Sequence, residues 1–361
     1  MIKHVELFAG IGGFRKAIDL LGKDFKIPVE CIAYSEKDKY AKITYNSNFE
    51  IESEIEIGDI NQFTNDKINI KKLPEFDLLT GGFPCQSFSM MGKQDGLKDE
   101  RGNLFYRILD ILKVKKPKYI LLENVKNLKN HDNGNTIKTI ISTLKKTGYT
   151  NIYYDIFNTA NFSLAQTRNR IFIFATTEKL LPQNFSFNQE SVIDSFYKIK
   201  NKSSLLKQNN VLDILESKVD SKYYLSEKIK PTILSNGSSG FISKSEINQL
   251  IARPLTATMV KMHRACQDNY YSDNFLKSKN KEKFLEKIFT KEELALQNIR
   301  KLTPKEALML QGFDDSFYLN SVKAAVSDHQ LYKQAGNAVS VNTVYAILNH
   351  LFVEHKLLKS K

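Results

Sequence analysis

The chain has 361 residues, of which 42% are hydrophobic and 26% charged, a composition typical of folded globular proteins and unlike that of disordered chains. Lysine and arginine outnumber aspartate and glutamate by 53 to 40, and the net charge of +13 favours a polyanionic partner such as nucleic acid. The three cysteines, Cys31, Cys85 and Cys266, lack the paired spacing of a disulfide framework or a zinc site. This cysteine usage favours a reducing compartment and no bound metal. No apolar run approaches the ~20 residues that span a bilayer, so we expect a cytoplasmic protein without a membrane segment.

The first half of the chain alternates strand-like and helix-like segments. Short apolar runs predict strands at residues 4–10, 31–36, 76–82, 118–125, 152–159 and 170–177. Helical spacing of apolar residues predicts helices at 14–22, 37–48 and 104–117. This alternation indicates an α/β fold with a mostly parallel sheet, helices on both faces, and ligands at the carboxyl ends of the strands.

The composition and the periodicity of the sequence change after Pro182. Residues 183–299 are rich in asparagine, serine and lysine and have weak periodicity, which predicts a second, less regular domain. An amphipathic helix at 340–356 is expected to pack back on the sheet domain. We therefore expect a catalytic domain of residues 1–182 and 330–361, and a smaller irregular domain with a hinge at residues 183–329.

The glycine-rich stretch FAGIGG (8–13) joins the first strand to the first helix, where glycines permit a tight turn and a close ligand. The dinucleotide fingerprint GxGxxG would require glycine where Arg15 stands, so the match to NAD binding is incomplete. Glu36 closes the second strand and could accept hydrogen bonds from ribose hydroxyls, while Asp59 follows the expected third strand, where an adenine amino group could bind. These features predict a nucleoside pocket; a tight connection with two solvated acids is the alternative.

Cys85 follows a proline at the end of a predicted strand, in GGFPCQSFS (81–89). A thiolate is a strong carbon nucleophile, but a free thiol with a pKa of about 8.5 needs a local positive potential to ionise at neutral pH. Glu123 ends the next strand, and the arginines of QTRNR, Arg168 and Arg170, can orient a carboxylate and bind a phosphate or a base. The alternatives are a buried structural cysteine, a surface glutamate and surface ion pairs. The residues by themselves indicate a nucleoside-dependent enzyme with a thiol nucleophile.

Eight successive segments resemble the conserved blocks of the DNA cytosine-5 methyltransferases. In chain order they are FAGIGG, YSE, GDI, GGFPCQSFS, ENV, QTRNR, RKLTPKEALMLQGF (300–313) and QAGNAVSVNTV (334–344). The resemblance covers the chain outside residues 183–299, the stretch where that family carries its variable target-recognition region. It implies a Rossmann-like S-adenosylmethionine-dependent methyltransferase fold, S-adenosyl-L-methionine as cofactor and double-stranded DNA as substrate.

The resemblance also implies a catalytic set of Cys85, Glu123, Arg168 and Arg170. The Cys85 thiolate would add to carbon 6 of a cytosine flipped out of the duplex, and carbon 5 would then accept the methyl group. Glu123 would hydrogen-bond or protonate ring N3, a general-acid role. Loss of the carbon 5 proton would expel Cys85. Arg168 is expected to support Glu123, and Arg170 to assist in binding the base or the nucleophile.

Two further sets of residues follow from the same resemblance. The cofactor is expected to contact residues of the glycine loop, of the following strand ends and of the QAGNAVS block: Phe8, Ala9, Gly10, Ile11, Gly12, Gly13, Glu36, Lys37, Asp59, Ile60, Pro84, Asn337 and Ala338. DNA is expected to contact the loop after Cys85 and the segment 253–275, through Gln86, Ser87, Ser89, Lys93, Arg101, Arg253, Thr256, Thr258, Lys261, His263 and Arg264. Gln267 and Asn269 of the same segment are also residue types that can read base edges or phosphates. A sheet-forming segment with Tyr270 and Tyr271 in the core is the alternative for 253–275, and Cys266 is expected to be non-catalytic.

The leading hypothesis is a DNA cytosine-5 methyltransferase, either the modification half of a bacterial restriction system, paired with a restriction endonuclease, or an orphan relative. We expect it to act as a monomer. A transfer RNA methylase on the same scaffold and an inactive DNA-binding homologue are alternatives, although the intact PCQ, ENV and QTRNR blocks argue against inactivity. A nucleotide-dependent dehydrogenase is disfavoured by Arg15. The sequence does not reveal which DNA sequence or which cytosine is modified.

Overall fold

The computed structural model describes residues 1–84, 104–200, 204–237 and 243–358. The chain forms two compact units. The first consists of Met1–Phe162, Asn169–Leu205 and Val339–Lys361, and the second of Ser163–Arg168 and Leu206–Ala338. Within the described residues, no helix combines the length and the apolar character needed to cross a bilayer.

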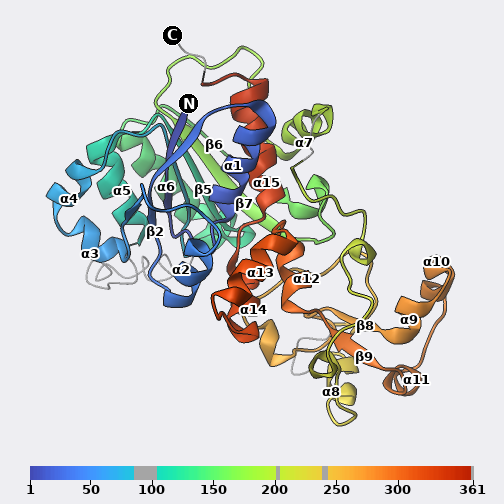
Figure 1. The fold of residues 1–361 in the computed structure, drawn as a ribbon. Coiled ribbons are helices and arrows are strands. Elements are labelled where there is room, and N and C mark those ends of the chain that lie inside the picture. The colour runs from blue at the N-terminus through green and yellow to red at the C-terminus, as the bar shows by residue number, and fades with distance from the viewer. Residues whose placement is uncertain (85–103, 201–203, 238–242, 359–361) are drawn as a thin grey trace. The chain divides into compact units, whose positions relative to one another are not determined.

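The first unit is built on a seven-stranded sheet with the order β3-β2-β1-β4-β5-β7-β6 (Figure 1). Its strands are β1 (Ile2–Leu7), β2 (Val29–Ser35), β3 (Ile55–Glu56), β4 (Leu78–Gly82), β5 (Tyr119–Val125), β6 (Asn151–Asn158) and β7 (Asn169–Thr176). β1 pairs in parallel with β2 and β4, and β4 with β5, whereas β7 is antiparallel to both β5 and β6. The chain order reverses between β1 and β4, and in such sheets ligands bind at the carboxyl ends of the strands beside this reversal.

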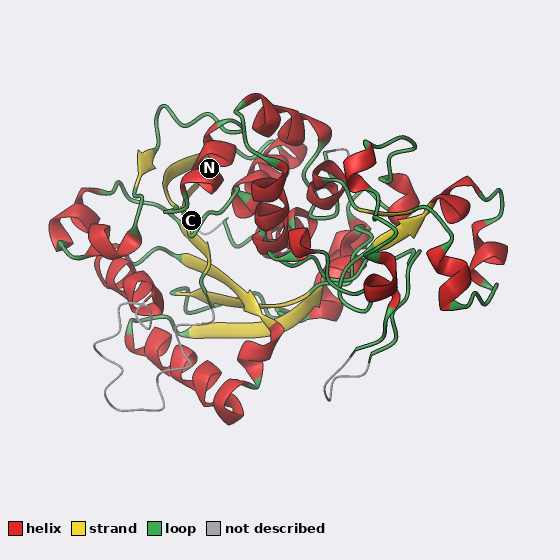
Figure 2. Cartoon of the chain, turned by 90° about the horizontal axis from the view of Figure 1, so that it is seen from below, coloured by secondary structure: helices red, strands yellow, loops and turns green. Residues whose placement is uncertain are grey.

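Helices cover both faces of this sheet (Figure 2). They are α1 (Gly13–Phe25), α2 (Lys39–Asn46), α3 (Ile60–Thr64), α4 (Lys67–Lys72), α5 (Leu104–Lys115), α6 (Asn135–Lys146), α7 (Gln189–Lys198) and α15 (Val341–Leu348), with a π-helix at Asn349–Glu354. Short 3₁₀ turns lie at Lys126–Lys129, His131–Gly134 and Thr159–Phe162. The predicted strands and helices of the first half are confirmed, although β1 ends at Leu7 and not at residue 10.

The expected C-terminal helix packs on the sheet unit as predicted, but its α-helical part is shorter. α15 packs on α1, where the Tyr345 hydroxyl donates to Asp24 over 2.8 Å. The chain then continues as the π-helix, whose Phe352 ring meets the Tyr119 ring of β5 edge-on at 5.3 Å. The C-terminal residues therefore complete the core around the central strands.

The central strand β1 buries polar side chains as well as apolar ones. His4 and Glu6 alternate with Val5 and Leu7, yet all four side chains are fully buried. A strand in the middle of a sheet with helices on both faces has no solvent-facing side, so the alternation of polar and apolar residues does not mark an exposed face here.

The second unit has little regular structure and a small antiparallel sheet. Its elements are β8 (Tyr270–Ser272), β9 (Ile299–Lys301), α8 (Lys230–Leu234), α9 (Asp273–Lys277), α10 (Lys281–Leu285), α11 (Lys291–Ala295), α12 (Pro304–Met309), α13 (Asp315–Lys323) and α14 (Asp328–Asn337), with 3₁₀ turns at Val211–Asp213, Ser221–Tyr223 and Met259–Lys261. The buried core of the small sheet includes Leu225, Ile233, Tyr270 and Ile299. This irregularity agrees with the weak periodicity of the sequence after Pro182.

The compact units differ in extent from the domains expected at residues 1–182 with 330–361 and at 183–329. Residues 183–205 belong to the first unit, because α7 packs on β6 and on the π-helix. The Ser195 hydroxyl of α7, for example, lies 2.7 Å from the His350 ring Nδ1. Residues 163–168 and 330–338 belong to the second unit.

Candidate functional site

The glycine loop between β1 and α1 adopts left-handed conformations that its sequence allows. Gly10 and Gly12 have φ of 56° and 83°. A Cβ at Gly12 would lie 2.3 Å from the Phe49 ring, and one at Gly13 would lie 2.7 Å from the Val339 carbonyl oxygen. A Cβ at Gly10 would meet no atom within 4 Å. The loop is therefore closely packed at its helix end, while the backbone at Gly10 has open space beside it.

Two acidic residues follow the neighbouring strands at the same edge of the sheet. Glu36, directly after β2, accepts a hydrogen bond of 2.8 Å from the Gly10 amide and another of 2.7 Å from the Asp38 amide. Asp59 follows β3 and caps α3 by accepting from the Asn61 amide at 2.9 Å. Lys37, 74% exposed, lies 3.9 Å from the Asp59 carboxylate. The structure thus joins the glycine loop to Glu36, and Asp59 to Lys37.

The segment that leads to Cys85 is described as far as Pro84 and is held from the neighbouring strand. Asn124, the central residue of ENV on β5, is buried and donates a hydrogen bond of 2.7 Å to the Phe83 carbonyl oxygen. This contact fixes the backbone just beyond β4. Cys85 and the expected DNA-contacting residues of the following loop, Gln86, Ser87, Ser89, Lys93 and Arg101, lie outside the described residues.

Glu123 and Arg170 form an ion pair at the ends of β5 and β7. Arg170 Nε lies 3.1 Å from Glu123 Oε1, and the two side chains are 20% and 13% exposed. Glu123 pairs in register with Gly82 of β4, and a Cβ at Gly82 would lie only 3.2 Å from Glu123 Oε2. The Glu123 carboxylate therefore lies beside the backbone of β4 three residues before Cys85, oriented by a guanidinium group.

Arg168 is placed differently from the expectation that it supports Glu123. Its buried guanidinium donates to the carbonyl oxygens of Leu255 at 3.0 Å, Gly336 at 3.0 Å and Ala338 at 2.9 Å, all in the second unit. The ion pair with Glu123 is formed by Arg170, which is expected to assist in binding the base or the nucleophile. Arg168 precedes the first residue of β7, so the alternation of that strand does not determine where its side chain points.

Gln166 is a positioning residue that sequence reasoning missed. Its buried carboxamide accepts from the Leu255 amide at 3.0 Å and donates to the Leu310 carbonyl at 2.9 Å. Gln166 and Arg168 thus hold both main-chain groups of Leu255. The only sequence signal was the presence of Gln166 in the QTRNR block.

Residues 253–269, which we call the recognition segment, expose some of the expected DNA-contacting side chains and bury their neighbours. Thr256, Thr258 and Lys261 are exposed, whereas Leu255 and Met259 are buried. The exposed side chains thus lie on one side of a segment whose apolar residues face its own unit.

The other three expected DNA-contacting residues of the segment are half-buried and make contacts within the second unit. Arg253 Nε donates to the Ala265 carbonyl at 3.1 Å, and Arg264 Nε donates to the Ser235 hydroxyl at 2.8 Å. His263 Nε2 lies 3.0 Å from the Thr258 hydroxyl.

The sheet-forming alternative for residues 253–275 holds only for the end of that stretch. Tyr270 and Tyr271 are buried in β8, which pairs with β9. The recognition segment before them contains turns and one 3₁₀ turn. Cys266, at its far end, is half-buried.

Gly336 of the QAGN block allows α14 to lie directly on the recognition segment. A Cβ at Gly336 would come within 2.2 to 2.3 Å of the backbone of Thr256 and Ala257, so no side chain can be accommodated there. Asn337, at the end of α14, is exposed and Ala338 is buried. Both belong to the second unit, whereas the other expected cofactor residues belong to the first.

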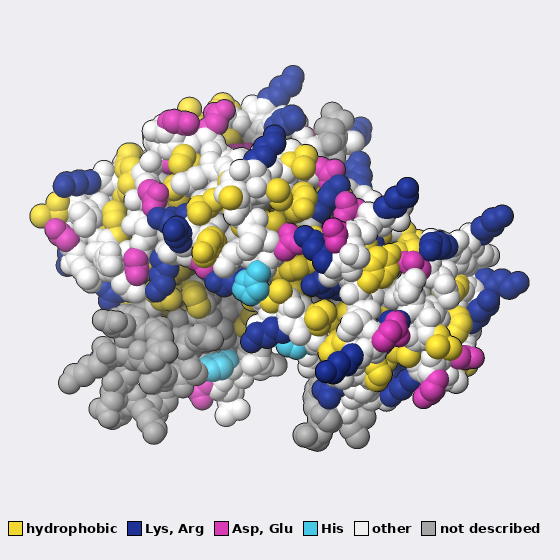
Figure 3. Space-filling model, turned by 60° about the horizontal axis from the view of Figure 1, so that its bottom comes forward, with side chains coloured by type: hydrophobic (Ala, Val, Ile, Leu, Met, Phe, Trp, Pro, Cys, Tyr) yellow, Lys and Arg dark blue, Asp and Glu magenta, His cyan; other side chains and the backbone are white. Residues whose placement is uncertain are grey.

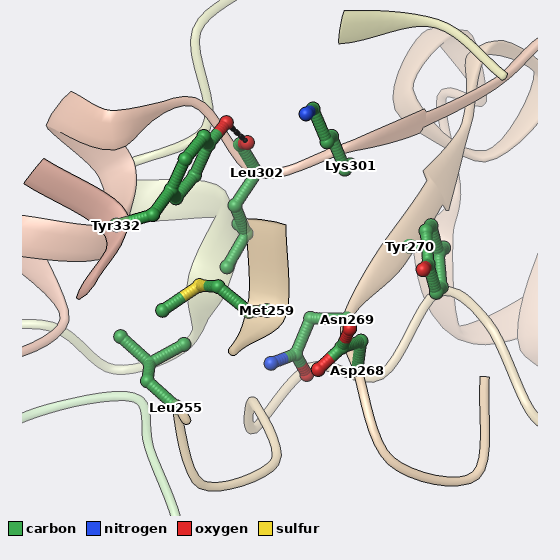
Figure 4. A pocket seen from close by; sticks show the side chains of 8 residues that line it. All are labelled: Leu255, Met259, Asp268, Asn269, Tyr270, Lys301, Leu302 and Tyr332. Atoms are coloured by element: carbon green, nitrogen blue, oxygen red, sulfur yellow. Dashed lines mark hydrogen bonds between the residues drawn. The ribbon is translucent and has the colours of Figure 1, made fainter. Parts of the chain in front are cut away.

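A small pocket lies within the second unit, between the recognition segment and the elements behind it (Figure 4). Its volume of about 20 Å³ is enough for about one water molecule and far too small for a nucleoside. The Lys301 ammonium lies 5.1 Å from the centre of the Tyr332 ring. The lining residues are Leu255, Met259, Asp268, Asn269, Tyr270, Lys301, Leu302 and Tyr332.

The RKLTPKE block has a structural role in this arrangement. Glu306 of α12 binds the buried Arg300 of β9 through two hydrogen bonds of 2.8 and 2.9 Å, and accepts from the Thr303 amide at 2.7 Å. The Thr303 hydroxyl in turn caps α12. These contacts join β9 to α12 and support the small sheet of the second unit.

Basic side chains are spread over the face of the molecule drawn in Figure 3 and do not gather in one patch. The high net charge therefore does not by itself locate a nucleic-acid surface. Among the described residues, no group of three or more histidine, cysteine or acidic side chains is arranged to hold a metal ion.

Comparisons with known proteins match this chain to methyltransferases over nearly its full length. The family model for "C-5 cytosine-specific DNA methylase" matches residues 2–353. The type II methyltransferase M1.ScrFI of Lactococcus lactis subsp. cremoris is 37% identical over 355 residues, covering 96% of this chain and 76% of the relative. M.HaeII of Haemophilus aegyptius is 36% identical, covering 96% and 91%. The solved structure of the Entamoeba histolytica methyltransferase EhMeth matches with a TM-score of 0.74 at 20% identity, covering 100% and 99%, which confirms the expected fold.

Proposed function

The chain belongs to the C-5 cytosine-specific DNA methylases, and we propose that it modifies one duplex sequence as part of a restriction-modification system. It is a DNA cytosine-5 methyltransferase, because the family match extends over residues 2–353 and is the observation that carries this conclusion. Its relatives M1.ScrFI and M.HaeII are type II methyltransferases by name, which supports the proposed role. The methyl mark would protect DNA from a partner endonuclease, and the chain would act as a monomer.

The proposed cofactor is S-adenosyl-L-methionine, held by the glycine loop, Glu36 and Asp59. When bound, it supplies a methyl group activated by a positively charged sulfur. The open space beside Gly10 leaves room for a ligand against the backbone. Each carboxylate oxygen of Glu36 accepts one backbone amide and retains capacity to accept a ribose hydroxyl. The other proposed contacts are Phe8, Ala9, Ile11, Gly12, Gly13, Lys37, Ile60, Pro84, Asn337 and Ala338.

The proposed nucleophile is Cys85, and the residues around its position suit that role. The Cys85 thiolate would add to carbon 6 of a cytosine extruded from the duplex, at an unstacking cost of a few kcal/mol. Addition breaks the aromaticity of the ring and makes carbon 5 electron-rich enough to accept a methyl group. Asn124 supports this step by fixing the Phe83 carbonyl two residues before the nucleophile.

Glu123 would act on ring N3 of the extruded base. A carboxyl group there can donate a hydrogen bond or a proton as negative charge builds on the ring, a contribution commonly worth ~10²–10⁴-fold in rate. Arg170 would hold the Glu123 side chain in place, since their 3.1 Å contact already exists in the structure. A water molecule would then take the proton from carbon 5, the electron pair left behind would restore the ring double bond, and Cys85 would leave as a thiolate while the proton on N3 returns to Glu123.

Methyl transfer from labelled cofactor to unmethylated genomic DNA and to transfer RNA tests the proposed substrate. We expect label in DNA, located at cytosines by bisulfite sequencing. Label in transfer RNA alone would refute the function. Cys85→Ser should abolish transfer, whereas the matched control Cys266→Ser should retain it.

DNA that carries 5-fluorocytosine at the target tests the covalent step, because fluorine at carbon 5 cannot leave as a proton does. The unaltered chain should become attached to this DNA and the Cys85→Ser variant should not. Efficient turnover without attachment would overturn the proposed mechanism while leaving the methyltransferase assignment intact.

A further inference from the structure

Asn269 closes the base of the recognition segment by holding the main chain of Arg253. Its side-chain oxygen accepts from the Arg253 amide at 2.7 Å, and its amide nitrogen donates to the Arg253 carbonyl at 3.2 Å. Asn269 is buried and Arg253 half-buried, so both hydrogen bonds are partly shielded from water. Only a carboxamide offers one acceptor and one donor in this geometry, and aspartate, its isostere, lacks the donor.

The residues on either side of Asn269 hold a second point of the segment in the same way. Asp268 accepts from the His263 amide at 2.9 Å, and the Tyr270 hydroxyl donates to the His263 carbonyl at 2.6 Å. Three consecutive side chains therefore satisfy both main-chain groups of Arg253 and both of His263. We call Asp268, Asn269 and Tyr270 the clamp.

Apolar packing restrains the position of the recognition segment less strongly than the hydrogen bonds of the clamp do. The pocket of about 20 Å³ lies beneath the buried Leu255 and Met259, between them and the Leu302 and Tyr332 side chains (Figure 4). Side chains that border a void lack contacts on that side, so their packing resists a small displacement only weakly. Directional hydrogen bonds to the main chain, from the clamp at Arg253 and His263 and from Gln166 and Arg168 at Leu255, then set the position of the segment.

We propose that Asp268, Asn269 and Tyr270 are positioning residues for DNA sequence recognition. They hold the main chain between Arg253 and His263, and this stretch carries the exposed Thr256, Thr258 and Lys261. The inference rests on the proposed function, in which these exposed side chains contact DNA. The four hydrogen bonds of the clamp go only to the backbone of the segment, so they fix where the outward-facing side chains lie without depending on which side chains they are.

Loosening the clamp should reduce discrimination between DNA sequences more than it reduces catalysis. A single good contact with a base edge favours the correct base over a wrong one by a factor of roughly 5 to 150. Displacement of the segment would reduce this factor. In Asn269→Asp a second oxygen would face the Arg253 carbonyl. We expect about a tenfold loss in the ratio of kcat/KM between the cognate site and singly substituted sites. The KM for DNA should rise, while kcat at saturating DNA stays within about threefold.

Asn248→Asp is the matched control. Asn248 is also buried in the second unit and also uses both ends of its carboxamide, accepting from the Ser272 amide at 2.7 Å and donating to the Ser272 hydroxyl at 3.2 Å. It lies outside the recognition segment. This variant introduces the same carboxylate at a buried site and should keep the discrimination ratio of the unaltered chain.

The experiment first identifies the methylated sequence of the unaltered chain by bisulfite sequencing. Initial rates are then measured with duplexes that carry the site or one substituted base pair, for Asn269→Asp, Tyr270→Phe and the Asn248→Asp control. Asp268→Asn should restore what Asp268→Ala loses, because the asparagine oxygen still accepts from the His263 amide. Tyr270→Phe removes one hydrogen bond only, so it tests the inference even if Asn269→Asp does not fold.

Failure of the positioning role can be distinguished from failure of the proposed function. If the unaltered chain transfers no methyl group to DNA, the proposed function falls before any variant is compared. If it does, equal discrimination by Asn269→Asp, Tyr270→Phe and the control would overturn the positioning role. A selective loss of discrimination in the two clamp variants would support it.

Discussion

Replacement of Glu6 by glutamine should make the protein more stable at neutral pH. Glu6 lies on the central strand β1 and is fully buried, and no side chain donates a hydrogen bond to its carboxylate oxygens. Burial raises the pKa of Glu6 from 4.5 to about 8, against the opposing effect of Arg15. Arg15 is itself paired with Asp19 and Glu54. The carboxyl group is therefore protonated in the folded chain at neutral pH.

The sign of the pH dependence follows from which state holds the proton. Between pH 4.5 and pH 8 the unfolded chain has lost the Glu6 proton and the folded chain retains it. The unfolded state binds fewer protons, so stability falls as the pH rises through this window, by about 1.4 kcal/mol per pH unit. The full contribution, present below pH 4.5 and lost by pH 8, is about 5 kcal/mol. At pH 7 the loss is about 3 kcal/mol, a large fraction of a typical folding free energy.

Glutamine at position 6 has the shape of the protonated acid but does not titrate. The free energy of unfolding, measured by urea denaturation and circular dichroism between pH 4.5 and pH 8, should be equal for Glu6→Gln and the unaltered chain at the acid end. It should be about 3 kcal/mol higher for the variant at pH 7. Other buried groups titrate in both proteins, so the difference between them isolates Glu6. A Glu6→Gln curve parallel to that of the unaltered chain would refute the reasoning.

Three further predictions concern the surroundings of the proposed nucleophile and the buried thiol. Gly82→Ala would place a Cβ 3.2 Å from the Glu123 carboxylate and displace it. Steady-state kinetics should therefore show kcat reduced about tenfold with unchanged cofactor affinity. An unaltered kcat would contradict the proposed role of Glu123. Asn124→Asp replaces the donor to the Phe83 carbonyl with an oxygen, and urea unfolding should show a loss of about 1–3 kcal/mol, with slower methyl transfer. Burial raises the pKa of the Cys31 thiol, so iodoacetamide and mass spectrometry should find it unmodified in the folded chain while the other described cysteine reacts.

Much of the first unit could be predicted because its strands and helices carry strong local signals. Apolar runs identified the strands that end at Gly82 and Val125, and the parallel arrangement then implied that Glu123 lies near the segment leading to Cys85. The contact of Glu36 with the glycine loop likewise follows from two strand ends meeting at one edge of a sheet.

The contacts that the sequence did not reveal are those made by polar side chains to distant backbone groups. Gln166 and Arg168 hold Leu255 across 89 and 87 residues of sequence, and no spacing pattern encodes such a pair. The clamp is equally hidden, because Asp268 and Asn269 have the composition of an ordinary polar turn. Whether a short polar side chain meets water or a buried carbonyl is decided by tertiary packing, which no local pattern specifies.

The order of the two arginines in QTRNR has a mechanical consequence. Arg168 is anchored to three backbone carbonyls of the second unit, and Arg170 holds Glu123 in the first. Only Asn169 separates them, so a displacement of the chain at Arg168 passes through few rotatable bonds before it reaches Arg170, the ion-pair partner of Glu123. If Glu123 acts as proposed, a displacement of the backbone held by Arg168 would therefore be transmitted to the proposed acid through three consecutive residues of the chain.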